Sequence, residues 1–400
     1  MNLFYAYCGN ALLIINAIKS VAAYHGPPPQ VLPHFYFNNE EVEIVDCYTY
    51  VGMSFGTGKF NVFSSVVGKH YDNKAQKALK VAHAVLHVES MIGSLPVCEG
   101  KILYMGCIDP HLIYGCEVTP DTSKALLDKL VGVQLSFFRW LLGLSKTSIK
   151  VAVFSETGIT YSTPIQFRRI TLTIRYLAYL LSRPMDSYVR AALNKSITLQ
   201  QAGYKTWFGD LLSVLKTLCP DLTLPGGDTL QNAVTPDHSY LLKLRKEPLE
   251  NNKMVYKTAC MRTYLESIEN HRHCKALTRL LVGDHSLAVV RLTWTDNHRM
   301  MVPHDERVCR FCKEAVETPE HALLVCRHIP LAERRQQFLA EFYASQPRAI
   351  VLRSDMDPIA YTAYLASCRS SFSIFAKWVF EVLKIYDSCP LYVPSQYQCR

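Results

Sequence analysis

The sequence is poor in charged side chains and lacks long apolar runs, internal repeats and low-complexity tracts. Charged residues make up 19% of the 400 residues and hydrophobic residues 49%, which argues against intrinsic disorder. The apolar run at residues 11–15 follows no basic segment and is too short to span a bilayer or to act as a signal peptide. We therefore expect an intracellular protein, nuclear or cytoplasmic, that is neither secreted nor bound to a membrane.

Catalytic signatures are also missing. No two aspartates are adjacent, and the chain has neither a G-x-x-x-x-G-K-[ST] phosphate loop nor an H-E-x-x-H metal motif. Most of the 14 cysteines stand singly in apolar runs, as Cys8, Cys47, Cys107 and Cys116 do, and are expected to be small core residues. The 43 Lys and Arg against 34 Asp and Glu give a charge of +9, which permits a nucleic-acid partner without requiring one.

Hydrophobic periodicity predicts a mainly α protein of the α+β class, and the length predicts several domains. A helix is expected to begin at Tyr5 and to run into a short buried strand by Ile18. Further strands are expected at 35–37, 42–45 and 47–55, the last with a bulge at Gly52. Helices are expected near residues 75–86, 101–108, 123–142, 164–182, 187–193, 209–218, 241–268, 273–282, 331–344 and 370–386. The predicted segments are 1–55 (α/β), 56–150 and 151–219 (helical), 220–240 (linker), 241–300 (basic, helical), 301–330 (knuckle) and 331–400 (helical).

The strongest chemical signal is a C-x2-C-x8-H-x4-C arrangement formed by Cys309, Cys312, His321 and Cys326. Two cysteines two residues apart bind one tetrahedral ion from a tight knuckle, and a following pair closes the site. Thr318 and Pro319 suit the start of a short helix that carries the second pair. Four protein ligands leave no open position, so the expected zinc is structural. His328 and, more weakly, His304 compete for the third position, and unligated core cysteines are the alternative.

A basic segment precedes this knuckle. Residues 271–299 hold five cations against Asp284 and Asp296, interleaved with histidines and a tryptophan, as in surfaces that contact phosphates and stack on bases. A solvated helix face is the competing interpretation. The candidate contacts are Arg272, Lys275, Arg279, Arg291, Trp294 and Arg299.

Several stretches stand in a recognisable order: NAIKS at 16–20, YVGMSF at 50–55, KILY at 101–104, PHLIYGCE at 110–117, FRWLLGL at 138–144, ETG at 156–158, and the cysteine–histidine cluster. Together they resemble the C-terminal portion of the reverse transcriptases of non-long-terminal-repeat retrotransposons, particularly the fungal ones. The resemblance implies the end of a polymerase palm with its Asn-x-x-Lys motif, a primer-grip hairpin, a thumb, a helical connection and a zinc knuckle. It implies nucleic-acid contacts from Lys19 and from the thumb residues Lys74, Lys77 and Lys80.

One departure from the family is decisive. Its polymerases carry adjacent aspartates just before the Asn-x-x-Lys motif, and two-metal nucleotidyl transfer requires such carboxylates. Because this chain has no such pair, we expect a truncated fragment that binds no Mg²⁺ and has no polymerase activity of its own. Its expected partners are RNA, an RNA–DNA hybrid or nicked DNA. The alternatives are a zinc-stabilised protein-interaction module and the back half of a split polymerase, whose upstream fragment would supply the aspartates.

Overall fold

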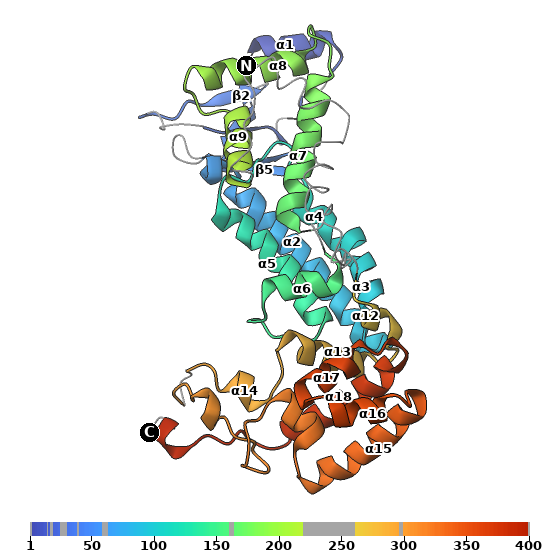
Figure 1. Ribbon diagram of the computed structural model, residues 1–400. Helices are drawn as coiled ribbons and strands as arrows, with labels where there is room; N and C mark the ends of the chain where they lie inside the picture. The colour runs from blue at the N-terminus through green and yellow to red at the C-terminus, as the bar shows by residue number, and fades with distance from the viewer. Residues whose placement is uncertain are drawn as a thin grey trace. The chain divides into compact units, whose positions relative to one another are not determined.

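The computed structural model is mainly helical, with small β-sheets near the N-terminus, in agreement with the predicted fold class (Figure 1). It describes the chain except for residues 1, 14, 17–18, 25–29, 38–39, 58–62, 160–163, 219–260, 296–298 and 399–400. The predicted linker 220–240 and the first part of the predicted helix 241–268 therefore lie outside the described residues.

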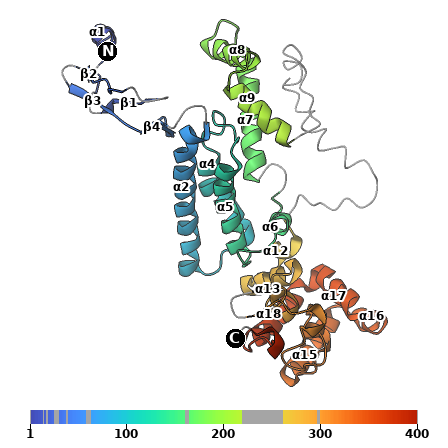
Figure 2. The same cartoon turned by 90° about the vertical axis from the view of Figure 1, so that its left-hand side faces the viewer.

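The chain divides into two compact units. Unit 1 consists of Met1–His83, Met105–Gln134 and Tyr161–Tyr256, and unit 2 of Ala84–Tyr104, Leu135–Thr160 and Lys257–Arg400. The division falls inside two helices, α2 (Phe63–Ile92) and α5 (Lys124–Leu141), which lie side by side (Figure 2). The chain thus leaves unit 1 and returns to it, so the units are not successive stretches of sequence.

Unit 1 begins with α1 (Asn2–Asn10), followed by a three-stranded sheet of order β1-β3-β2. Strand β3 (Glu40–Ile44) pairs in parallel with β1 (Val21–Ala22) and antiparallel with β2 (Phe35–Phe37). The helix predicted from Tyr5 is present as part of α1, and Leu12 takes a positive φ of 56° just after α1 ends. The buried strand predicted to end by Ile18 is wrong over the described residues, since Leu12 and Leu13 are 91% and 60% exposed.

The stretch predicted as a single strand with a bulge at Gly52 is instead a hairpin. Strands β4 (Cys47–Tyr50) and β5 (Met53–Gly56) pair antiparallel across a two-residue turn. Val51 and Gly52 both have positive φ, 47° and 74°, as the favoured hairpin turns require. A Cβ at Gly52 would lie 2.9 Å from the Tyr114 hydroxyl oxygen, so this turn also needs glycine for a close approach.

The helices of unit 1, apart from the unpredicted α4, confirm the predicted amphipathic segments, with shifted ends. They are the first part of α2, the π-helical turn η2 (Tyr104–Ile108), α4 (Asp109–Ile113), the first part of α5, α7 (Ile165–Leu181), α8 (Tyr188–Gln201) and α9 (Trp207–Leu218). One apolar cluster joins the last three helices, with Leu177, Leu193 and Leu211 among its buried members. Burial of these side chains is what fixes the three helices against one another.

A buried ion pair ties three helices of unit 1 together. The Arg169 guanidinium, 2% exposed, donates from Nε to both carboxylate oxygens of Asp121 at 3.0 and 2.9 Å. Its other nitrogens donate to the Leu112 carbonyl oxygen at 2.7 Å and the Tyr71 hydroxyl oxygen at 3.0 Å. Tyr71 in turn donates to Asp121. The network joins α2, α4 and α7, and sequence patterning gave no sign of it.

Replacing Arg169 by methionine should leave the Asp121 carboxylate buried without its partner. Loss of one member of a buried ion pair costs about 3–5 kcal/mol, so the urea midpoint of unit 1 should fall sharply. The control is Arg183→Met, because Arg183 is exposed and lies over the Tyr179 ring; it should change stability by less than about 0.5 kcal/mol. Equal midpoints for the two variants would contradict the structural role of the ion pair.

Unit 2 is built almost wholly from helices. They are α3 (Val97–Leu103), α6 (Lys150–Thr157), α12 (Thr263–Ser267), α13 (His271–Val282), α14 (Ala288–Arg291), η4 (His304–Glu306), η5 (His321–Val325), α15 (Ile329–Ser345), α16 (Ala349–Asp355), α17 (Pro358–Ser367), η6 (Arg369–Ser371), α18 (Phe372–Asp387) and η7 (Ser395–Tyr397), with the ends of α2 and α5. Among the helices longer than five residues, three were not predicted: α6, α16 and α17. Two of the three are shorter than ten residues, so their apolar periodicity covers barely two turns.

Helix α18 is the central element of unit 2, and α12, α13, α15 and α17 all pack on it (Figure 1). Its buried residues recur at steps of one, three and four, so one broad face of the helix is apolar. Phe338 of α15 stacks on Trp378 of α18 with ring centroids 5.4 Å apart. This aromatic core places the C-terminal end of α18, and with it Tyr386, next to the knuckle.

Candidate metal centre

Unit 2 brings together the four side chains that the sequence singled out. The ligand atoms of Cys309, Cys312, His321 and Cys326 all lie within 4.8 Å of one another. The Sγ atoms of Cys309 and Cys326 are 3.8 Å apart, which is the edge expected, about 3.8 Å, of a tetrahedron with Zn–S bonds of about 2.3 Å. Cys312 Sγ lies 3.3 Å from His321 Nε2. The geometry and the donor set therefore fit a closed, structural zinc site.

The first pair of ligands sits on a short turn closed by backbone hydrogen bonds. The amide of Cys309 donates to the Ala315 carbonyl at 2.8 Å, and that of Lys313 to the Cys309 carbonyl at 2.9 Å. Lys313 takes a positive φ of 58°, which lets the chain reverse directly after Cys312. Val308 and Val316 form an antiparallel bridge at the open end of the turn. The knuckle thus orients both thiols toward the same point.

The second pair is carried by a helical turn, as predicted, although the turn is π-helical. Thr318 caps it, since its hydroxyl oxygen accepts from the His321 amide at 3.2 Å. The Cys326 amide donates to the His321 carbonyl at 2.7 Å and so closes η5 over five residues. This wider spacing returns Cys326 to the side of the turn occupied by His321.

The competing histidine ligands lie elsewhere. The His328 ring stacks on Phe311, with centroids 4.2 Å apart and 9° between the planes, and His328 stands at the N-cap of α15. His304 is exposed in η4 and pairs with Asp305 at 3.2 Å. Among the described residues, the group of His, Cys, Asp and Glu side chains that can hold a metal therefore contains His321 and neither alternative.

A second buried ion pair organises the knuckle, and sequence analysis missed it. Arg310, between the two cysteines, lies 2.6 Å from Glu317, and Glu317 also accepts from the amides of Arg310 and Ala288, both at 2.8 Å. The guanidinium donates further to the carbonyls of Tyr386, Cys389 and Ser286. These bonds hold the knuckle against the end of α18 and the start of α14. An Arg and a Glu seven residues apart gave no signal in the sequence.

Positive and polar groups face the sulfur atoms. Arg335 of α15 donates to the carbonyls of Leu323 and Cys326, which places its charge beside the second pair. The contact between Cys309 and Cys326 lowers the pKa of the Cys309 thiol and raises that of the Cys326 thiol, because the Cys326 S–H donates to the Cys309 thiolate. Without metal the two sulfur atoms thus share one proton, and metal binding must release it.

The nucleic-acid candidates of unit 1 divide into exposed and buried groups. Lys19, Lys77 and Lys80 are exposed. Lys74, in contrast, is buried, with its amine 3.7 Å from the centroid of the Tyr114 ring, and burial lowers its pKa. The structure therefore gives Lys74 a packing contact within unit 1, and leaves three free cations from this group.

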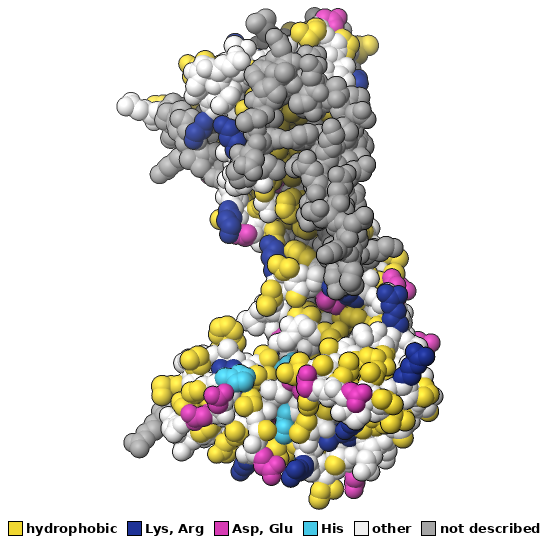
Figure 3. Space-filling model, viewed as in Figure 1, with side chains coloured by type: hydrophobic (Ala, Val, Ile, Leu, Met, Phe, Trp, Pro, Cys, Tyr) yellow, Lys and Arg dark blue, Asp and Glu magenta, His cyan; other side chains and the backbone are white. Residues whose placement is uncertain are grey.

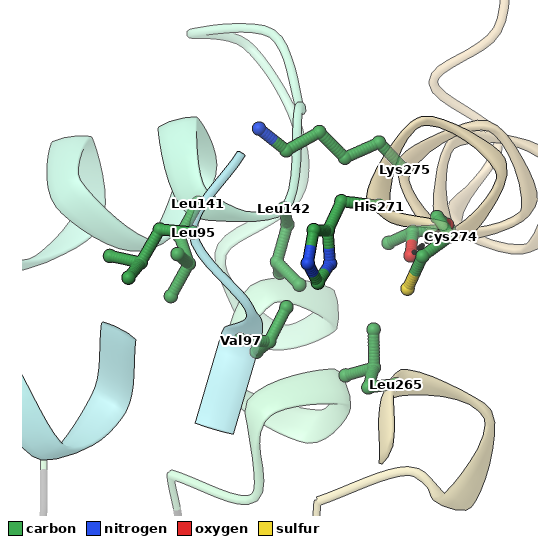
Figure 4. A pocket seen from close by; sticks show the side chains of 9 residues that line it. Leu95, Val97, Leu141, Leu142, Leu265, His271, Cys274 and Lys275 are labelled. Atoms are coloured by element: carbon green, nitrogen blue, oxygen red, sulfur yellow. Dashed lines mark hydrogen bonds between the residues drawn. The ribbon is translucent and has the colours of Figure 1, made fainter. Parts of the chain in front are cut away.

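In unit 2, most of the predicted cations have partners. Lys275 lies 3.6 Å from Glu89 and 4.7 Å from the Trp140 ring. Figure 4 shows its side chain running above His271; both residues line a cavity of about 10 Å³ whose other walls are mainly apolar side chains. This cavity has room for about one water molecule and for no larger ligand.

The remaining arginines of the segment contact mainly its own backbone. Arg279 donates to the Asp284 carbonyl at 3.2 Å, and Arg299 to the carbonyls of Trp294 and Arg291. Arg291 is half-buried. Only Arg272 and Trp294, among the six predicted residues, are exposed, and Trp294 is 71% exposed.

A G-x-S-x-G sequence at 52–56 was overlooked, and the structure shows that it is no nucleophile elbow. Ser54 lies within strand β5, not on a strand-to-helix turn, and is buried. Its hydroxyl bonds to Asn73 at 3.0 Å and to Thr49 at 3.2 Å. His70 is close, yet it accepts from the Ser54 amide and contacts the Tyr114 carbonyl. The serine is therefore a packing residue.

Comparison with known proteins finds no matching family model, no similar curated protein and no similar solved structure. Of the helices that the structure describes, none has the length and apolar character needed to cross a bilayer. The metal centre is thus the feature from which function can be argued.

Purified protein should contain one zinc per chain by elemental analysis, and a strong chelator should lower its melting temperature by several degrees, since structural zinc contributes directly to folding. Cys312→Ser should reduce the zinc content well below one. Cys98→Ser is the control, because Cys98 is an exposed cysteine of unit 2 outside the cluster. Full zinc content in Cys312→Ser, or an unchanged melting temperature of the wild type after addition of the chelator, would refute the assignment of a structural zinc site.

A buried histidine predicts how unit 2 responds to acid. His285 is 2% exposed and its Nδ1 is buried without a hydrogen-bond partner; burial, with Arg279 and Arg291 nearby, lowers its pKa to about 4. The unfolded chain binds this proton below about pH 6.5 and the folded chain only below about pH 4. Stability should therefore fall as the pH drops through that window, by on the order of 3 kcal/mol.

The measurement is the pH dependence of the unfolding free energy of the wild type and of His285→Asn. The variant removes the titrating group, so its curve should be flatter between pH 6.5 and 4, whatever its stability at neutral pH. Parallel curves would show that His285 does not contribute to the acid response.

Proposed function

We propose that this chain is a retrotransposon-derived reverse transcriptase fragment that binds nucleic acid, is stabilised by one zinc ion and has no polymerase activity of its own. The observation that carries the proposal is the closed set of four ligands in unit 2, three of them buried and Cys312 half-buried. Such a site has no open coordination position, so the metal holds the fold together and does not take part in a reaction. The remaining task of the chain is then binding.

Two stretches that resemble the polymerase family meet in unit 1, which supports the proposal. The hairpin β4–β5 contacts the segment at 110–117, where the Tyr114 hydroxyl donates to the Val51 carbonyl. Between them lies a groove of about 640 Å³. Tyr50 and Tyr114 line this groove and are 68% and 41% exposed. The Lys74 amine covers one face of the Tyr114 ring, so Tyr50 is the ring that we expect to stack on an unpaired base.

Positive charge lies close to the groove. His111 of α4 has a lowered pKa, because of burial and of the charges of Lys74 and Lys77. Lys77 and Lys80 are exposed on α2 and can contact phosphates. Aromatic faces combined with free amines are the usual composition of a single-strand binding surface. Without adjacent aspartates, the fragment binds no catalytic Mg²⁺ and extends no primer alone.

Binding of a fluorescent single-stranded RNA, and of an RNA–DNA hybrid, should weaken steeply as salt rises. The double variant Lys77→Ala/Lys80→Ala should lower the slope of log K against log salt by roughly 1.5, for two lost phosphate contacts. Lys195→Ala/Lys216→Ala is the control: it removes two exposed lysines of the same unit, on α8 and α9. Fluorescence anisotropy measures both slopes.

A flat salt response of the wild type, or equal losses in the two variants, would contradict nucleic-acid binding through α2. Those results would favour the second candidate, a zinc-stabilised module that binds a protein partner. The observation in its favour is the surface of unit 2, where hydrophobic side chains abound and Lys and Arg are scattered (Figure 3). Ile329, Val351 and Ile359 are each more than 60% exposed. A split polymerase, the third alternative, predicts primer extension only after mixing with a fragment that carries the aspartates.

A further inference from the structure

Helix α18 reaches the metal centre through one side chain. The Tyr386 hydroxyl oxygen lies 3.3 Å from Cys309 Sγ, and both residues are 0% exposed. Within the described residues, the hydrogen-bond partners of this hydroxyl are the sulfur atoms of Cys309 and Cys326. Burying a hydroxyl costs free energy unless the hydroxyl forms a hydrogen bond. The contacts with the sulfur atoms offset this cost for Tyr386.

Metal binding fixes the direction of this bond. A cysteine bound to zinc is a thiolate and has no proton to give, whereas its sulfur keeps lone pairs that can accept. The Tyr386 hydroxyl must then be the donor. Three thiolates and one Zn²⁺ leave the site with a net negative charge, and a donor aimed at a sulfur lowers the free energy of that buried charge.

The ring of Tyr386 is held in place by the knuckle itself. Phe311 meets it edge to face, with centroids 4.9 Å apart. Arg310 donates to the Tyr386 carbonyl at 2.6 Å, and its guanidinium lies 5.3 Å from the ring centroid. Both residues lie between Cys309 and Cys312, so the segment that supplies the first two ligands also positions the donor.

From these contacts we infer that Tyr386 is a positioning residue for the metal centre: it donates a hydrogen bond to the Cys309 thiolate and couples zinc binding to the docking of α18. Outer partners of metal ligands commonly change metal affinity 10–100-fold when they are lost. The inference rests on the zinc site and is independent of nucleic-acid binding, so each can fail without the other.

The test is Tyr386→Phe, which removes the hydroxyl and keeps the ring. Zinc affinity, measured by competition with a chromophoric chelator, should fall at least about tenfold. In the Co²⁺-loaded protein, the sulfur-to-metal charge-transfer bands should shift, because one thiolate loses its donor. Circular dichroism at saturating zinc should match the wild type, since the packing of the ring is retained.

Tyr361→Phe is the matched control. Tyr361 is a buried tyrosine of the same unit, 1% exposed, and its hydroxyl donates to the Ala349 carbonyl at 3.3 Å instead of to a metal ligand. This variant loses a comparable buried hydroxyl and should keep wild-type zinc affinity within about twofold. Equal affinities for the wild type and Tyr386→Phe, or equal losses in the two variants, would overturn the inference.

Hydrogen exchange provides a second readout that does not depend on any variant. Removal of zinc from the wild type should speed amide exchange in α18, because its C-terminal end loses its anchor at the metal centre. Helices α8 and α9 of unit 1 serve as the internal reference and should exchange at unchanged rates. Protection of α18 that persists without metal would contradict the coupling.

Discussion

The organisation of unit 2 depends on one electrostatic constraint: the ligand atoms of three cysteines and one histidine lie within 4.8 Å of one another, and three of the four residues are buried. Negative charges this close repel strongly away from water, and a divalent cation among them removes the repulsion. The residues around the four ligands also stabilise this arrangement. Glu317 and Arg310 fix the knuckle, Arg335 places its charge beside Cys326, and Tyr386 offers a hydroxyl to Cys309.

Unit 1 is organised differently, around apolar contacts between helices and the buried pair of Arg169 and Asp121. Its surface offers a groove next to a hairpin and exposed lysines on one helix. Among the described residues, the group of three or more His, Cys, Asp and Glu side chains that could hold a metal is the one in unit 2. Each unit holds a buried ion pair, Arg169 with Asp121 in unit 1 and Arg310 with Glu317 in unit 2.

The sequence predicted the long amphipathic helices and the four metal ligands, because these depend on local spacing. Helix α2 and the knuckle are examples in which every determinant lies within 30 residues. Sequence patterns could not predict that Lys74 would be buried by Tyr114, or that Arg310 would bond to residues more than 70 positions away. Such partners are set by tertiary packing, and neither lysine nor arginine carries a pattern that reveals its partner.

The most direct test of the central claim is X-ray absorption at the zinc edge of the purified full chain. The site described here predicts an inner shell of three sulfur atoms at about 2.3 Å and one nitrogen at about 2.0–2.1 Å, with no bound water. A shell of four sulfur atoms, or one dominated by nitrogen and oxygen, would contradict the assignment of Cys309, Cys312, His321 and Cys326 as a closed structural site.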